Sequence, residues 1–216
     1  MTRVPARITA AVDLLRIHPG DTILEIGCGN GTAAALICER LGDGRLVAID
    51  RSETQIRRAR ERNRAHLASG TLTLHVMALE SAILPEAPFD TIFAINVNCF
   101  WLRADEPLAA VRRLLKPDGM FYVFYEHPTA AKMRDVAAVL RTNLVRAGLT
   151  IRDETATGPV YALASTLTAH ECTDMAAIPE ATREPDFPRS VAQHVDFSAL
   201  RSTNRWRQRE TALCRR

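Results

Sequence analysis

The chain has 216 residues, which is enough for one full domain with a substantial core and too few for two complete domains. Hydrophobic residues make up 47% of it and charged residues 25%, as in ordinary globular proteins, which excludes a fibrous repeat or disorder throughout. The formal net charge of +3 is too small to indicate nucleic-acid binding.

In its first half the chain alternates between apolar runs and segments with helical spacing. The elements expected there, in chain order, are a helix around Ile8–Leu15 that stops at "HPGD", a strand over 22–27, a helix over 32–41, a strand over 45–50, a helix over 53–67 and a strand over 71–77. A loop containing Pro85 and Pro88 follows this last strand.

The second half continues the alternation and then departs from it. It predicts a strand over 89–97, a helix over 106–115 broken by "KPDG", a strand over 120–126, a helix over 130–147, and strands over 149–155 and 160–166. The last two strands are separated by Ala156–Pro159 alone, which is too short for a parallel crossover, so one must run antiparallel to its neighbour. We therefore expect an α/β fold, a doubly wound, mostly parallel seven-stranded sheet with an antiparallel terminal hairpin.

Residues 170–216 lack this patterning and end in the Arg-containing sequence "RSTNRWRQRETALCRR". We expect residues 1–169 to form the domain and residues 170–216 to be a loosely ordered tail, with folding over the active site or partner binding as alternatives.

The cysteines and the N-terminal sequence favour a cytoplasmic protein. No CxxC pair occurs among the five cysteines, which predicts reduced thiols and no metal site. The N-terminal apolar stretch contains arginines and lacks a small-residue cleavage site, which argues against a signal peptide. No apolar run is long enough to cross a bilayer, so no membrane partner is expected.

The sequence "EIGCGNG", Glu25–Gly31, lies between the first predicted strand and the helix after it, where open parallel sheets bind ligands. A dinucleotide fingerprint needs a sixth-position glycine, and Thr32 occupies that position. A phosphate loop needs a Lys-Ser or Lys-Thr pair after the glycines, and this chain has none there. The carboxylate of Glu25 would repel phosphate and attract a cation, so the turn predicts a cationic ligand without phosphates.

These residues resemble the core motif of class I S-adenosylmethionine-dependent methyltransferases, an acid followed by Gly-x-Gly-x-Gly. The resemblance covers roughly Ile8–Thr166 and implies the Rossmann-like methyltransferase fold, with S-adenosyl-L-methionine as cofactor. It also implies that Asp50, at the end of "VAID", accepts both ribose hydroxyls, with Arg51 beside the adenosine.

Further segments match the family in order. Glu80 and Ser81 stand where the family usually has Asp-Ala against the adenine, and Asn96 lies near the methionine part of the cofactor. "LLKPDGMFYV" resembles the turn before the fifth strand, with Asp118 in place of one glycine. The resemblance thus implies this set of cofactor-binding residues: Glu25, Gly27, Cys28, Gly29, Asn30, Gly31, Asp50, Arg51, Glu80, Ser81 and Asn96.

The methyl acceptor is open at this stage, and no catalytic residue is assigned. His127 and Glu126 are candidates for substrate-facing groups, with His127 as a general base or as a backbone-bonded loop histidine. Phe100 and Trp101 are candidates for a pocket wall or for the core. The sequence "NVNC" differs from the Asn/Asp-Pro-Pro-aromatic motif of amino-methylating nucleic-acid relatives, so we expect a small-molecule acceptor.

Two other functions stay open. One is a non-catalytic Rossmann-like protein that binds the cofactor or serves as an accessory subunit. The other is a nicotinamide-dependent oxidoreductase, which Glu25 and Thr32 disfavour.

Overall fold

A computed structural model describes residues 3–126, 129–157 and 160–168 of the chain. Its helices are α1 (Ala6–Leu14), α2 (Thr32–Cys38), α3 (Glu53–Arg62), α4 (Arg64–Ala68), α5 (Cys99–Leu102), α6 (Asp105–Leu114) and α7 (Ala130–Arg146). Its strands are β1 (Thr22–Ile26), β2 (Arg45–Asp50), β3 (Leu72–Val76), β4 (Phe89–Ile95), β5 (Leu115–Tyr125), β6 (Leu149–Thr157) and β7 (Val160–Leu167). None of the helices in these residues is long and apolar enough to cross a membrane.

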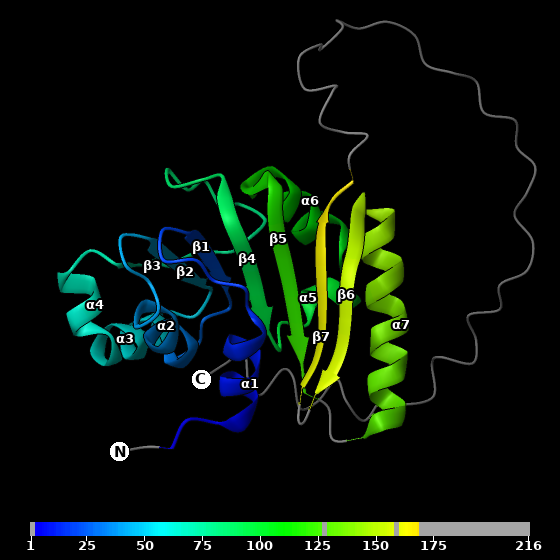
Figure 1. The fold of residues 1–216 in the computed structure, drawn as a ribbon, viewed down its shortest axis with the longest axis horizontal. Coiled ribbons are helices and arrows are strands. Elements are labelled where there is room, and N and C mark those ends of the chain that lie inside the picture. Colours follow the sequence, from blue (N-terminus) through cyan, green and yellow to red (C-terminus); the bar gives the residue numbers. More distant parts are fainter. Residues whose placement is uncertain (1–2, 127–128, 158–159, 169–216) are drawn as a thin grey trace, which may run out of the picture. The chain divides into compact units, whose positions relative to one another are not determined.

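The strands form one seven-stranded sheet in the order β3-β2-β1-β4-β5-β7-β6 (Figure 1). Strands β1 to β5 pair in parallel, and β7 is antiparallel to both β5 and β6. The strand order reverses beside β1, so the carboxyl ends of β1 and β4 flank a switch point where ligands bind in such sheets. The predicted doubly wound sheet with an antiparallel hairpin is confirmed.

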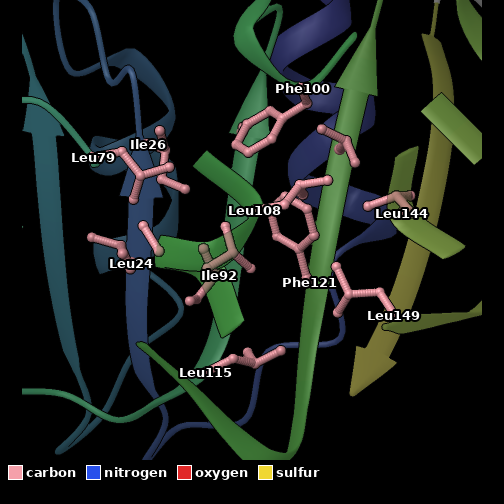
Figure 2. Close-up of a cluster of buried hydrophobic side chains, with 14 of the residues drawn as sticks. Leu24, Ile26, Leu79, Ile92, Phe100, Leu108, Leu115, Phe121, Leu144 and Leu149 are labelled. Atoms are coloured by element: carbon pink, nitrogen blue, oxygen red, sulfur yellow. The ribbon is translucent and has the colours of Figure 1, made fainter. Parts of the chain in front are cut away.

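Each face of the sheet packs against its own helices. On one face, side chains of α1, α2 and α3 such as Val12 and Ile37 bury Ile23 and Phe93 of the strands. On the other face, α5, α6 and α7 cover a larger core that contains Phe100 and Phe121 (Figure 2). Successive residues of β1 alternate between the two cores, as expected for a strand that is buried on both sides.

Three predicted boundaries differ from the structure because tertiary contacts decide them. The predicted helix over 53–67 is divided at Asn63, whose side-chain amide donates to the carbonyls of Gly31 and Ala59, both at 3.0 Å. A short helix, α5, was not predicted. The "KPDG" turn lies within the bounds of β5, where the register with β4 shifts.

The other elements match within a few residues. The crossover from β3 to β4 is a loop, as predicted, and the hairpin connection is shorter than Ala156–Pro159 because β6 extends to Thr157. All described residues belong to one unit of the chain, Met1–Ala176. The predicted domain boundary after residue 169 and the predicted tail, 170–216, lie outside the described residues.

Candidate active site

A cavity of about 240 Å³ opens at the carboxyl ends of β1 and β2, and we call it the β1–β2 cavity. Four of the predicted cofactor-binding residues line it: Gly27, Asp50, Arg51 and Glu80. The rest of its lining is apolar and was not singled out from the sequence: Ile26, Ile49, Met77, Leu79, Val97 and Cys99. Their position at or just after strand ends, on parallel strands that share one sheet edge, is the signal that identifies them.

The glycine turn adopts a backbone conformation that requires glycine. Gly27, Gly29 and Gly31 all have positive φ, at 69°, 54° and 72°. A Cβ on Gly27 would lie 2.6 Å from Cγ2 of Val97, so the turn also approaches the β4 end closely. Nothing lies within 4 Å of a Cβ built on Gly29, so this glycine faces open space. The turn therefore leaves room for a ligand directly against its backbone.

Asp50 ties the glycine turn to the end of β2. Its Oδ2 accepts the N–H of Gly29 at 2.9 Å, and its Oδ1 accepts the N–H of Ser52 at 2.8 Å. Ser52 caps α3, because its side-chain oxygen accepts a hydrogen bond from the N–H of Gln55 at 3.3 Å. Asp50 is thus free of the capping role, and each carboxylate oxygen keeps a lone pair for a ligand donor.

Glu25 is a buried carboxyl group with an unsatisfied oxygen. The residue is 3% exposed, and its Oε2 has no hydrogen-bond partner among the described residues. Burial, and then the negative charge of Asp50, raise the pKa of Glu25 to about 8. Without a cation nearby the group is therefore mostly protonated at neutral pH.

Arg51 and Glu80 form an ion pair at the cavity, with Nη2 and Oε1 2.5 Å apart. Burial raises the pKa of Glu80, but its own backbone N–H and the Arg51 guanidinium lower it by more, so the pKa lies below 4.5. Its second oxygen, Oε2, is buried without a hydrogen-bond partner among the described residues. Glu80 therefore offers an ionised acceptor to a ligand in this cavity.

Three other predicted residues, two in the turn and one after β3, are not among the residues that line the cavity. Cys28 is buried in the core, and burial raises the pKa of its thiol, so it carries no reactive thiolate. Asn30 is exposed, and its Oδ1 accepts a hydrogen bond from the hydroxyl of Thr32 at 2.7 Å. Ser81 is exposed and donates to the carbonyl of Ala78 at 3.3 Å.

Asn96 lines a second cavity, of about 190 Å³, at the carboxyl ends of β4 and β5. This β4–β5 cavity is lined by Asn96, Asn98, Trp101, Tyr125, Glu126, Met133 and Val136. The two cavities share one segment of chain, because Asn96 and Asn98 face this cavity whereas Val97 and Cys99 face the other. Asn96 thus lines a different cavity from the four predicted residues Gly27, Asp50, Arg51 and Glu80.

The aromatic candidates divide between the two roles considered for them. Trp101 lines the β4–β5 cavity, whereas Phe100 is fully buried and makes an edge-on contact with Phe121, at 5.2 Å between ring centroids. Glu126 lines the cavity as well. His127 lies outside the described residues.

The polar groups at the β1–β2 cavity fit a cationic nucleoside. Asp50 and Glu80 supply carboxylate acceptors, and Glu25 lies buried behind the turn. Arg51, the one cation among the described residues of the lining, is already paired with Glu80. The apolar strand-end side chains suit the faces of a flat base. A phosphate group would meet carboxylates here instead of free cations.

Comparison with known proteins agrees with this geometry. Residues 23–119 match the family model described as "Methyltransferase domain". The putative methyltransferase YrhH of Bacillus subtilis (strain 168) is 30% identical over 132 residues, which are 60% of this chain and 71% of that protein. The structure of a SAM-dependent methyltransferase from Aquifex aeolicus has a TM-score of 0.61 at 18% identity, covering 73% of this chain and 88% of that one.

A plant relative is matched over a smaller part of its length. The 24-methylenesterol C-methyltransferase 2 of Oryza sativa subsp. japonica is 33% identical over 122 residues, 56% of this chain. The match spans only 33% of that relative. The glycine turn, the sheet order and these similarities together establish that the chain belongs to the class I S-adenosylmethionine-dependent methyltransferase family.

Proposed function

We propose that this chain binds S-adenosyl-L-methionine in the β1–β2 cavity and transfers its methyl group to a small-molecule acceptor. The polar groups of the site carry the proposal. Carboxylate acceptors lie in an otherwise mostly apolar cavity, and a buried Glu25 oxygen without a hydrogen-bond partner among the described residues lies behind the glycine turn. Cationic nucleosides match this set, because the carboxylates lower the energy of a positive charge. The location expected from the sequence, the cytoplasm, stays a prediction.

The proposal assigns parts of the cofactor to particular residues. Asp50 accepts the ribose hydroxyls, as the family resemblance implies, while it holds the turn through Gly29. Glu80 accepts the adenine amino group through its unpaired Oε2. Glu25 compensates the positive charge of the methionine part from behind the turn.

The residues of the chain contribute mainly binding and alignment. When bound, the cofactor supplies an electrophilic methyl group on a sulfonium, which a nucleophile displaces in line. The glycine turn and Asp50 hold the cofactor, and the neighbouring β4–β5 cavity holds the methyl acceptor. Holding both reactants together converts a bimolecular reaction into an effectively unimolecular step. A general base is needed only where the acceptor loses its proton early.

A small molecule is the acceptor class that the chain supports best. The residues after β4 read "NVNC", Asn96–Cys99, instead of Asn/Asp-Pro-Pro-aromatic, and the β4–β5 cavity has a volume of only about 190 Å³. The name of the rice relative indicates a sterol acceptor for that protein. We carry over from it only the size class of the acceptor.

Calorimetric titration with S-adenosylmethionine, its demethylated product and NAD tests cofactor binding. We expect the first two to bind and Asp50→Ala to weaken them by about 1.5–3 kcal/mol, the cost of losing charge-assisted hydrogen bonds. Asp43→Ala is the matched control, because Asp43 is an exposed aspartate before the opposite end of β2. Tight NAD binding with no response to S-adenosylmethionine would overturn the proposal.

Transfer itself is tested by mass spectrometry after incubation with labelled cofactor and a metabolite extract. A labelled methylated product is the expected result. Cofactor binding without any turnover across varied acceptors would instead favour the non-catalytic alternative.

A further inference from the structure

The β4–β5 cavity has a distinctive charge pattern. Glu126 is the only acidic or basic residue among the described residues of its lining. The aromatic rings of Trp101 and Tyr125 and the thioether of Met133 supply much of the remaining surface. A carboxylate beside aromatic faces attracts organic cations, through charge and through the ring quadrupoles.

Glu126 is held at the cavity by its backbone. Its N–H donates to Oδ1 of Asn96 at 2.8 Å, and Asn96 has a φ of 56°, a left-handed conformation that few non-glycine residues adopt. The Asn96 N–H in turn donates to the carbonyl of Phe124 at 2.8 Å. These bonds join the ends of β4 and β5 and place Glu126 at the cavity rim.

The carboxylate of Glu126 remains available to a ligand. Its only ion pair in the described residues is with Arg7 of α1, at 3.4 Å between Nη1 and Oε2. Both side chains are about 40% exposed, at 39% for Arg7 and 41% for Glu126, so the pair is worth little free energy. An ammonium group in the cavity can therefore compete with Arg7.

We propose that the β4–β5 cavity selects an amine as the methyl acceptor, with Glu126 as the specificity-determining residue. The inference rests on the proposed function, because it assumes that the acceptor meets the cofactor across the segment from Asn96 to Cys99. The volume of the β4–β5 cavity, about 190 Å³, lies below the roughly 300–1,000 Å³ of pockets that enclose drug-sized ligands. The cavity therefore holds only the amine end of the acceptor.

The proposed step balances without a further reactant. The bound ammonium group first loses a proton to water, and the neutral amine nitrogen then uses its lone pair to form the bond to the methyl carbon. The bond between that carbon and sulfur breaks, and its electron pair stays on sulfur. Positive charge therefore moves from sulfur to nitrogen, where Glu126 lies, and a primary or secondary amine then loses its proton to water. The carboxylate stabilises the charge that develops on the acceptor.

Carboxylate acceptors fit this cavity poorly. An anionic acceptor would face Glu126, the described residues of the lining include no cation to bind it, and like charges at close range repel. Neutral alcohols lose nothing from the carboxylate but gain no ion pair. The order expected for matched compounds is therefore amine, then alcohol, then carboxylate.

Three probes with one skeleton test this order: 2-phenylethylamine, 2-phenylethanol and phenylacetate. Each is titrated calorimetrically into the full chain saturated with S-adenosylhomocysteine, so that the readout is binding and does not depend on turnover. We expect 2-phenylethylamine to bind at least about tenfold more tightly than phenylacetate, a difference of about 1.4 kcal/mol. Equal affinities, or no binding of the amine up to about 10 mM, would overturn the inference.

Three variants show which side chain is responsible. Glu126→Gln should remove the preference for the amine, whereas the control Glu61→Gln, at an exposed position of α3, should retain it. Arg7→Ala should leave amine binding unchanged or tighter, because it frees the carboxylate. Loss of phenylacetate binding in Arg7→Ala would show instead that Arg7 binds anionic acceptors and that the assignment is wrong.

Failure of this inference is distinguishable from failure of the proposed function. If S-adenosylhomocysteine itself does not bind, the assignment of the β1–β2 cavity is wrong. If it binds and the probes show no amine preference, only the acceptor class is wrong. Glu126→Gln should leave the affinity for S-adenosylhomocysteine within about twofold, because Glu126 does not line the β1–β2 cavity.

Discussion

Cofactor binding should release a proton from Glu25. Its pKa of about 8 means that roughly 90% of the groups are protonated at pH 7 and roughly 10% at pH 9. If the positive charge of the cofactor returns the pKa toward 4.5, the group ionises on binding. About 0.9 proton should then leave per cofactor bound at pH 7, and about 0.1 at pH 9.

Calorimetry in buffers with different ionisation enthalpies measures this release. The apparent binding enthalpy varies linearly with the ionisation enthalpy of the buffer, and the slope gives the number of protons. Glu25→Gln is the matched control, because it keeps the size of the side chain and cannot ionise. The cofactor's own amino group contributes equally to the slope of both proteins. Subtracting the slope of Glu25→Gln from that of the original chain therefore leaves the protons released by Glu25.

Other groups of the site do not account for such a proton. Burial raises the pKa of Cys99 to about 11, and the pKa of Glu80 lies below 4.5, so neither titrates near pH 7. An equal slope for Glu25→Gln and the original chain at pH 7 would refute the assignment of Glu25. So would a slope for the original chain that does not fall between pH 7 and pH 9.

Three stability predictions concern the glycine turn and the start of α3. Because the folded-state pKa of Glu25 is raised, its contribution to stability is fully present below pH 4.5 and is lost as the pH rises through about 8, with a ceiling of about 5 kcal/mol. Urea unfolding of the ligand-free chain should therefore find Glu25→Gln more stable at pH 9 and nearly equal at pH 4.5; equal stability at pH 9 would contradict the burial argument. Gly31→Ala should lower the unfolding free energy by about 2–4 kcal/mol, because a Cβ there lies 2.5 Å from Nδ2 of Asn63 and the residue has positive φ. Gly29→Ala should lower it by only about 1–2 kcal/mol, because positive φ is the only cost at that position. Ser52→Ala should lower the unfolding free energy by about 0.5–2 kcal/mol through loss of the α3 cap, and no change would show that Asp50 caps the helix instead.

The order of elements could be predicted from the sequence because each has a local signal. Alternating apolar runs and helical segments indicated the parallel strands, and the short connection before Val160 required an antiparallel hairpin. Asp50 was identified through the family resemblance, as the residue that ends the apolar segment "VAID". The order of elements and the hairpin thus depend on spacing along the chain, whereas the site residues needed the resemblance as well.

The features that escaped prediction depend on contacts between distant segments. The helix expected over 53–67 is interrupted because Asn63 bonds the carbonyl of Gly31, which lies 32 residues earlier. Phe100 and Trp101 are neighbours in the sequence with equal aromatic character, and only the packing of α5 sends one into the core and the other to a cavity. The apolar lining of the β1–β2 cavity likewise arises where separate strand ends meet.

The segment from Asn96 to Cys99 serves as a wall with a different side chain on each surface. Odd-numbered residues face the β1–β2 cavity and even-numbered residues face the β4–β5 cavity. Asn98 lines the β4–β5 cavity and is not among the residues that line the β1–β2 cavity. Replacement of Asn98 can therefore change the surface offered to the acceptor without changing the residues that line the cavity assigned to the cofactor.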